Sequence, residues 1–454
     1  LIHNPKGFVG GNFKTMSTNP RDFYAPSTIK NLLLTSIDSV VSNINCYTKS
    51  PDVDFTRVRK ITADTLIKFI LLMSTDKSMN SNLFDYFTLA YDLPSQSAMC
   101  QRRNLLYPDA LRSVMRLFTD NMENLKTFNG YYLLACDGSD INIPYNPDDM
   151  ETFHLGNDDS RGYNQLHLNA LYDVCNHIYQ DIQIDTHTKK NETYALEDMI
   201  KMHNYPDNSV IICDRGYEKY NLFALCIERN QKFLIRIKDV NSNGILSTMN
   251  LEDTEFDIDI TKTLTRLQTN EVKTHPEKYV RLMTNCPDFE YLKTEDDYYD
   301  LPLRIVRFKI TDDTYECLAT NLGREEFPFE VMKELYHKRW NIEESFKTLK
   351  YAIGADSFSS KKQNSIRQEI YAKVILYNFS SFIINNTVID QPADKYKINF
   401  HVAVTNIRSY LKNEIDETNL TAKIKKFLTL IRPGRTYERR LKPKHATPLA
   451  YKHS

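Results

Sequence analysis

The sequence lacks the features that mark several common classes of protein. None of its eight cysteines forms a C-x-x-C pair, and its eleven histidines show no metal-ligand spacing. This argues against a zinc ribbon, and scattered cysteines are typical of a reduced, cytosolic protein. The most apolar segments, Leu66 to Met73 and Val374 to Ile384, are well short of the roughly 18 to 20 residues that span a bilayer. We expect no contact with a membrane.

We expect no secretory leader. Residues 1–15 contain no basic segment followed by an apolar run, which is the pattern of a signal peptide. We therefore expect a cytoplasmic protein, with Met16 as a candidate for the natural start.

The chain carries little net charge: 58 lysines and arginines oppose 59 acids, which gives −1. This balance alone argues mildly against a nucleic-acid partner. The distribution, however, is uneven. Residues 421–454 hold ten basic residues and one acid, whereas residues 239–302 hold fourteen acids and six bases. Because DNA responds to local patches rather than to the total charge, the basic tail indicates a DNA contact. A solvated tail is the alternative.

Apolar periodicity divides the chain into regions. Up to about residue 129 apolar residues recur at spacings of three and four, which predicts helices. One of these helices begins at Ser95 and ends with Arg102 and Arg103. We interpret residues 1–129 as a helical DNA-binding domain, with a plain helical bundle as an equally good reading.

From Tyr131 onward the pattern becomes that of strands alternating with helices. We expect three strands, a helix, a strand, a helix and a strand, at residues 131–136, 165–174, 177–184, 192–203, 210–213, 220–229 and 233–237. This order indicates an α/β fold with a mixed sheet and flanking helices.

The rest of the chain falls into three parts. Residues 239–302 interrupt the rhythm and resemble an insertion of short strands and loops. Residues 303–390 resume the α/β region with a hairpin that ends near Thr320, a long helix from about Pro328 past Lys350, and another helix at residues 363–385. Residues 391–454 form a C-terminal helical and basic region, suited to DNA or dimer contacts.

Two acids, Asp137 and Asp214, each follow a buried apolar strand. Open α/β proteins place their sites at strand ends on one edge of the sheet. A glycine follows closely in both cases, at Gly138 and Gly216, and allows a tight turn beside the carboxylate. Since aspartate and glycine are also common in turns, each acid on its own is weak evidence.

The long helix carries a polar strip beside an apolar face. Tyr336, Arg339, Glu343 and Lys350 fall within an arc of about 60°. The adjoining arc holds the apolar side chains of Leu335, Ile342, Phe346, Leu349 and Ile353. The strip thus borders the core without being part of it. A partly solvated helix with salt bridges is the alternative.

Together the three acids predict a metal centre. Carboxylate oxygens suit Mg²⁺ or Mn²⁺, and two such ions activate the attacking oxygen and stabilise the leaving oxygen in phosphoryl transfer. Asp137, Asp214 and Glu343 are therefore the candidate catalytic residues and metal ligands. Arg339 and Lys350 lie beside them and are candidates to neutralise phosphates.

The residues on this helix have the spacing Tyr336-x2-Arg339-x3-Glu343-x6-Lys350. This resembles, without a gap, the Y-(2)-R-(3)-E-(6)-K signature of bacterial DDE transposases of insertion-sequence family four. Four further segments are similar to that family, namely those around the two aspartates, the strand before the glutamate helix and a tail motif, at residues 135–139, 212–217, 318–322 and 432–437. The resemblance extends from about residue 95 to residue 444.

The resemblance implies a ribonuclease-H-like core with a strand-rich insertion between Asp214 and Glu343, which are 129 positions apart. It implies an enzyme of the bacterial cytoplasm and nucleoid that uses two Mg²⁺ ions, which Mn²⁺ can replace, and acts as a homodimer on terminal inverted repeats and target DNA. Cutting, often hairpin formation, and strand transfer would follow.

The same resemblance assigns DNA contacts. Tyr336, Arg339 and Lys350 would hold phosphates near the hairpin and a flipped base, and Arg215 beside the second aspartate would join them. Trp340, the single tryptophan, either stacks on DNA or packs in the core, and packing is favoured.

Other acids and other functions compete with this interpretation. Asp140, Asp173, Asp181 and Asp185 are rival carboxylates, of which Asp173 is either a neighbour of the site or, as we favour, a strand-end cap. A nuclease or resolvase with the same centre is the first alternative function. A DNA-binding derivative without catalysis is the second, although all three acids are present.

Overall fold

A computed structural model describes residues 24–432, apart from residues 58, 75–76, 88–92, 156–160, 284–288, 295–296 and 313. The candidate start at Met16 and all but the first residue of the tail motif at 432–437 lie outside the described residues. No helix within the described part of the chain is both long and apolar enough to cross a membrane.

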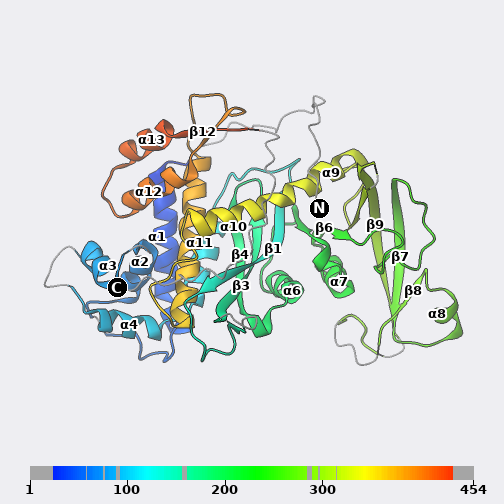
Figure 1. The fold of residues 1–454 in the computed structure, drawn as a ribbon, viewed down its shortest axis with the longest axis horizontal. Helices are drawn as coiled ribbons and strands as arrows, with labels where there is room; N and C mark the ends of the chain where they lie inside the picture. Colours follow the sequence, from blue (N-terminus) through cyan, green and yellow to red (C-terminus); the bar gives the residue numbers. More distant parts are fainter. Residues whose placement is uncertain are drawn as a thin grey trace.

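The fold is mixed α/β, as the sequence predicts, and is built on one ten-stranded sheet (Figure 1). Its strands run in the order β2-β3-β1-β5-β6-β10-β9-β7-β8, and β4 pairs with β3 beside β2. Their bounds are β1 Tyr132–Ile143, β2 Phe153–His154, β3 Tyr163–Asp173, β4 Ile178–Thr186, β5 Ser209–Cys213, β6 Lys232–Ile237, β7 Phe256–Thr265, β8 Tyr279–Arg281, β9 Tyr298–Thr311 and β10 Thr314–Thr320.

The centre of the sheet joins an antiparallel part to a parallel part. β1 runs antiparallel to β3 and parallel to β5, and β5 runs parallel to β6. Every residue of β5 is buried, which matches the continuous apolar sequence expected of a strand covered on both faces. All seven elements predicted for residues 131–237 are present in the expected order.

Helices cover both faces of this sheet. The bounds are α1 Pro26–Ser42, α2 Ala63–Leu72, α3 Met79–Tyr86, α4 Gln96–Leu105, α5 Asp109–Asp120, α6 Glu192–Met202, α7 Tyr220–Glu228, α8 Asn270–Thr274, α9 Phe329–His337, α10 Asn341–Tyr351, α11 Gln363–Asn385, α12 Phe400–Leu411 and α13 Glu417–Lys426. A small hairpin of β11 Tyr396–Ile398 and β12 Leu428–Leu430 lies beside the last two helices (Figure 1).

The two faces of β1 belong to two different cores. Leu133 and Ala135 lie in the core shared with α1, α2, α5, α10 and α11, whereas Leu134 and Cys136 lie in the core shared with α6 and α7. Since successive strand residues point to opposite faces, Asp137 continues the face toward α10, and Gly138 continues the face toward α6.

The N-terminal helices pack on the C-terminal ones. Both α1 and α5 contact α11, and their apolar side chains belong to the core that also covers the sheet. The predicted start at Ser95 is confirmed: its side chain accepts a hydrogen bond from the backbone N–H of Ala98 and caps α4.

The strand-rich insertion extends the sheet at one edge, on the right of Figure 1, where β7 pairs with β9 and β8 pairs with β7. Its acids contact arginines that follow it in the chain. Arg307 pairs with Asp239 and Asp253, and Arg304 pairs with Asp257. The excess of acids in residues 239–302 is therefore partly neutralised within the fold.

Candidate active site

The first aspartate lies within a strand rather than at its end. The sequence predicts that the strand stops at Asp137, but β1 continues to Ile143 because its pairing with β3 extends to Ile143 and Asn164. What ends beside Asp137 is the parallel pairing with β5, whose last register pair is Cys136 and Cys213. The strand prediction was thus too short, although the change in pairing falls where the aspartate is.

The two aspartates are therefore the next residues along two neighbouring parallel strands. Asp137 Oδ1 accepts a hydrogen bond of 2.9 Å from the N–H of Gly138. Asp214 caps the short 3-10 helix η4 (Arg215–Tyr217), where its Oδ1 accepts a bond of 2.8 Å from the N–H of Gly216. In each case the following glycine supplies an N–H that fixes the carboxylate.

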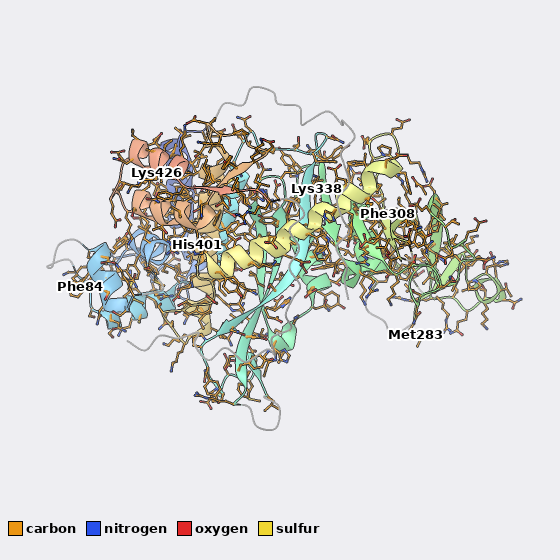
Figure 2. The ribbon with its side chains drawn as sticks, turned by 45° about the horizontal axis from the view of Figure 1, so that its top comes forward. Phe84, Met283, Phe308, Lys338, His401 and Lys426 are labelled. Atoms are coloured by element: carbon orange, nitrogen blue, oxygen red, sulfur yellow. The ribbon has the colours of Figure 1, made fainter. Side chains whose placement is uncertain are left out.

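The third acid lies on a helical stretch that crosses the sheet, drawn in yellow in Figure 2 with Lys338 labelled. The sequence predicts one continuous helix here. The structure instead has α9, the 3-10 helix η5 (Lys338–Trp340) and then α10, which carries Glu343 in its first turn. The predicted apolar face is confirmed, since all of its members are buried: Leu335, Ile342, Phe346, Leu349 and Ile353.

One guanidinium joins two of the three acids. Arg339 lies in η5 and is only 5% exposed. Its Nη1 lies 3.6 Å from Asp137 Oδ2, and its Nη2 donates a bond of 3.2 Å to Glu343 Oε1. The charge of Asp214 also acts on this guanidinium. Asp137 and Glu343 thus flank a single buried cation, and Asp214 lies on the strand next to Asp137.

The surroundings of Asp137 disfavour the charged form of its carboxyl. Burial raises the pKa of its carboxyl to about 6, and the negative charges of Asp214 and Glu192 add to that rise. Arg339 and the bond from Gly138 oppose it. A carboxylate that is buried among other acids gains most from an added positive charge.

The donor set fits a divalent cation. Within the described residues, no three histidine, cysteine, aspartate or glutamate side chains are arranged so that they could hold a metal ion directly. Asp137, Asp214 and Glu343 nevertheless carry oxygen ligands of the kind that Mg²⁺ and Mn²⁺ prefer, and Arg339 now bridges Asp137 and Glu343. Their negative charge is what such an ion would neutralise.

The other members of the signature differ in their exposure. Tyr336 is 2% exposed, and burial raises the pKa of its phenol to about 12. The Nζ of Lys350 donates to Ser139 Oγ at 2.7 Å and to the carbonyl of Asp140 at 2.8 Å, so this lysine is bound to β1. Arg339 connects the remaining two, since it bonds Glu343 and lies 6.0 Å from the centre of the Tyr336 ring.

Two predicted DNA contacts lie at the surface. Trp340 is 39% exposed, which is more than the core packing favoured from the sequence, and its ring lies 4.9 Å from the Arg339 guanidinium. Arg215 is exposed beside Asp214. Both are next to residues of the centre in the sequence, Arg215 beside Asp214 and Trp340 beside Arg339.

The rival acids serve other bonds. Asp173 is the strand-end cap that the sequence favours, since its Oδ1 accepts bonds from the backbone of Cys175 and Asn176. Asp181 is held between two arginines of α5, Arg112 and Arg116. The remaining two bind polar neighbours on the antiparallel strands: Asp140 pairs with His167, and Asp185 accepts from Asn169.

Sequence reasoning missed two residues close to the centre. His167 on β3 and Glu192 at the start of α6 meet beside Gly138, the neighbour of Asp137. In the sequence, Glu192 is recognisable only as the first residue of the helix that follows three strands. No spacing pattern relates it to His167.

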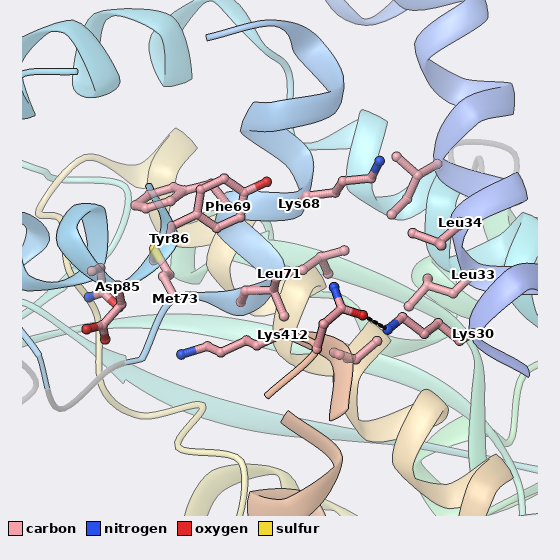
Figure 3. A pocket seen from close by; sticks show the side chains of 15 residues that line it. Lys30, Leu33, Leu34, Lys68, Phe69, Leu71, Met73, Asp85, Tyr86 and Lys412 are labelled. Atoms are coloured by element: carbon pink, nitrogen blue, oxygen red, sulfur yellow. Dashed lines mark hydrogen bonds between the residues drawn. The ribbon is translucent and has the colours of Figure 1, made fainter. Parts of the chain in front are cut away.

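A cavity of about 520 Å³ lies elsewhere in the molecule (Figure 3). It is bordered by α1, α2, α3 and the end of α12, with leucines along its wall and Lys30 bonded to Asn413 at its edge. None of the predicted catalytic residues lines it, so this cavity is separate from the carboxylate centre.

Half-buried carboxylates where two central parallel strands separate, facing a helix that carries a third acid and a buried arginine, suit a phosphoryl-transfer enzyme. The family model of the transposase DDE domain matches residues 128–379, which is more than half of the chain and includes all three acids. The chain belongs to this family and is a DDE transposase.

Among solved structures, the chain is similar to a piggyBac transposase, in the cryo-EM structure of its synaptic complex with hairpin DNA. The sequence identity is 13% and the TM-score is 0.43, with 93% of this chain and 89% of that chain covered. A comparison with curated proteins found no match.

Proposed function

We propose that this transposase cuts and rejoins DNA at the ends of an insertion sequence, by a cut-and-paste route, with Asp137, Asp214 and Glu343 as the ligands of two Mg²⁺ ions. The observation that carries the proposal is the position of the Arg339 guanidinium, which pairs with Asp137 and Glu343. The negative charge of Asp214 also raises the pKa of this guanidinium. One acid from a strand and one from a helix share this cation, and Asp214 follows the strand beside Asp137. The topology around β1, β5 and β6 supports a ribonuclease-H-like core.

Divalent ions bound there would polarise the scissile phosphate and lower the pKa of the attacking hydroxyl or water. The protein supplies the placement. The N–H groups of Gly138 and Gly216 fix the two aspartates, and α10 presents Glu343 from the other side. Rigid placement of this kind lowers the cost of aligning the reacting groups.

Arg339 and Tyr336 are proposed to hold a DNA phosphate. The Nε of Arg339 and the hydroxyl of Tyr336 are buried and have no hydrogen-bond partner among the described residues. Buried donors of this kind require an explanation, and a bound ligand is a common one. The phosphate oxygens of a DNA end would accept both bonds.

Lys350, Arg215 and Trp340 are proposed to extend the DNA contact. Lys350 would have to exchange its bonds to β1 for a phosphate, whereas Arg215 and Trp340 are already exposed. An exposed indole offers a face on which an unpaired base can stack. We further propose that the enzyme acts as a homodimer on terminal inverted repeats in the bacterial nucleoid, with Mn²⁺ able to replace Mg²⁺.

The test is a time course on a labelled element end in Mg²⁺ that separates nicked, hairpin and joined products. Joined products are expected, and their formation should stop when a chelator is added. A nuclease with the same centre would accumulate cut DNA without joining it, and that result would overturn the transposition step. Binding without any cutting would identify a derivative that has lost catalysis.

A further inference from the structure

Gly138, the residue after Asp137, is closely packed on the face of β1 that points away from α10. A Cβ built on Gly138 would lie 2.4 Å from His167 Nε2 and 2.5 Å from Glu192 Oε1, closer than real Cβ contacts allow. Glycine is therefore required at position 138, because His167 and Glu192 occupy the space that any larger side chain would need. Glu192 thus lies against the backbone of the residue next to the first catalytic aspartate.

His167 holds Glu192 in this position. The histidine is 2% exposed, and the register of β1 and β3 places it directly opposite Asp140. Its Nδ1 donates to Asp140 Oδ1 at 2.6 Å, and its Nε2 lies 3.1 Å from Glu192 Oε1. A buried ring that is bonded to one carboxylate through Nδ1 and faces a second with Nε2 has little freedom to turn. Lys190 also contacts Asp140, at 3.1 Å.

The location of Glu192 on α6 points to a role beyond capping the helix. The N-cap of α6 is Asn191, whose side chain accepts from the N–H of Tyr194, so the helix start is already bonded. The Glu192 side chain instead turns to His167 and remains one-third exposed. Its Oε1 lies 2.5 Å from the position that a Cβ of Gly138 would take, so its charge lies beside the residue that follows Asp137.

We propose that Glu192 is a fourth carboxylate of the catalytic centre, held by the positioning residue His167, and that its charge strengthens the binding of divalent cations. The inference rests on the proposed metal function of Asp137 and Asp214. Glu192 acts across β1 through its charge, while the other three acids supply the ligands. Loss of a residue that supports metal ligands typically weakens metal binding by about 10- to 100-fold.

The test is a titration of the whole protein with Mn²⁺ in the absence of DNA. Isothermal titration calorimetry measures the affinity for the ion. Glu192→Gln keeps the size of the side chain and removes its charge, so affinity should fall roughly tenfold. His167→Gln should lower affinity in the same direction but less. The matched control is Asp198→Asn, which removes an exposed acid from the same helix and should leave affinity unchanged.

A shorter acid separates charge from packing. Glu192→Asp keeps the charge and should retain more affinity than Glu192→Gln. Equal losses in the two variants, unfolding of both, or wild-type affinity in Glu192→Gln would overturn the proposal. Asp214→Asn distinguishes a failure of the Glu192 proposal from a failure of the proposed metal centre. If Asp214→Asn loses Mn²⁺ while Glu192→Gln does not, only the fourth carboxylate is refuted, whereas if neither variant loses Mn²⁺ the proposed metal centre is refuted as well.

Discussion

Asp137 and Asp214 directly follow Cys136 and Cys213, the last register pair between the parallel strands β1 and β5. The two acids are therefore brought side by side by the sheet itself, at the point where the strands separate. Both cysteines are fully buried, which anchors the strands just before the carboxylates. The position of the two acids depends on backbone pairing, and only Glu343 depends on how a helix packs.

The cations beside the acids should matter more for joining than for the first cut. A transposase must hold one strand end through successive steps, so Arg339→Ala or Lys350→Ala should leave some nicking and impair hairpin formation or joining more strongly. The assay is the time course on a labelled element end. Lys347→Ala is the matched control, because this lysine is exposed on the same helix and pairs with Glu344 rather than with the centre.

Wild-type nicking and joining in both variants would show that this strip is only a solvated helix face. Complete loss of nicking would place Arg339 and Lys350 in the first step and contradict the order of events predicted here.

The half-buried carboxyl of Asp137 should lower the stability of the metal-free protein at neutral pH. Burial raises its pKa in the folded protein to about 6, above the unfolded value, so folding takes up a proton between pH 4 and 6. Stability therefore falls as the pH rises through this range. Asp137→Asn removes the effect and should stabilise the metal-free protein by up to about 3 kcal/mol at pH 7.5, with little gain at pH 4.

Thermal melts with a chelator present, at the two pH values, measure this difference. A variant that is less stable than the wild type at pH 7.5 would mean that the ion pair of Asp137 with Arg339 outweighs the cost of burial.

The arginines that neutralise the acidic insertion should be structural. Arg307 is buried, pairs with Asp239 and Asp253, and lies 3.8 Å from the ring of Tyr315. Arg307→Ala removes a buried guanidinium and its bonds to two partly exposed acids, and should cost about 2 kcal/mol of unfolding free energy. Arg324→Ala, which breaks a more exposed pair, should cost about 1 kcal/mol or less.

Denaturant unfolding of the two variants gives the comparison. Equal small losses would mean that the insertion acids are solvated rather than bound within the fold.

The sequence was sufficient for the order of strands and helices along residues 131–237, because apolar runs such as 210–213 are buried on both faces and end at turn residues. It was also sufficient for the apolar face of α10, because helical periodicity survives the short 3-10 segment at Lys338–Trp340. It placed the end of β1 too early. An Asp-Gly pair usually signals a turn, and the long pairing of β1 with β3 overrides that local preference.

The role of Arg339 between two acids was outside the reach of sequence reasoning, as was the contact of His167 with Glu192. His167 and Glu192 are 25 positions apart and meet only because β3 pairs with β1 and α6 packs on the same face. Neither periodicity nor local spacing records such a contact. The neutralisation of the acidic insertion could not be predicted for the same reason. The arginines that pair with its acids lie on β9 and meet them only in the folded chain.

The most direct test of the shared metal centre compares two neighbouring glutamates on α10. Glu343 faces Arg339, whereas Glu344 is exposed and pairs with Lys347. Glu343→Gln should reduce Mg²⁺-dependent cleavage of a labelled element end by orders of magnitude while salt-sensitive DNA binding persists. Glu344→Gln should cut DNA like the wild type. Equal activity in the two variants, or loss of DNA binding together with cleavage in Glu343→Gln, would contradict the assignment of Glu343 as a metal ligand.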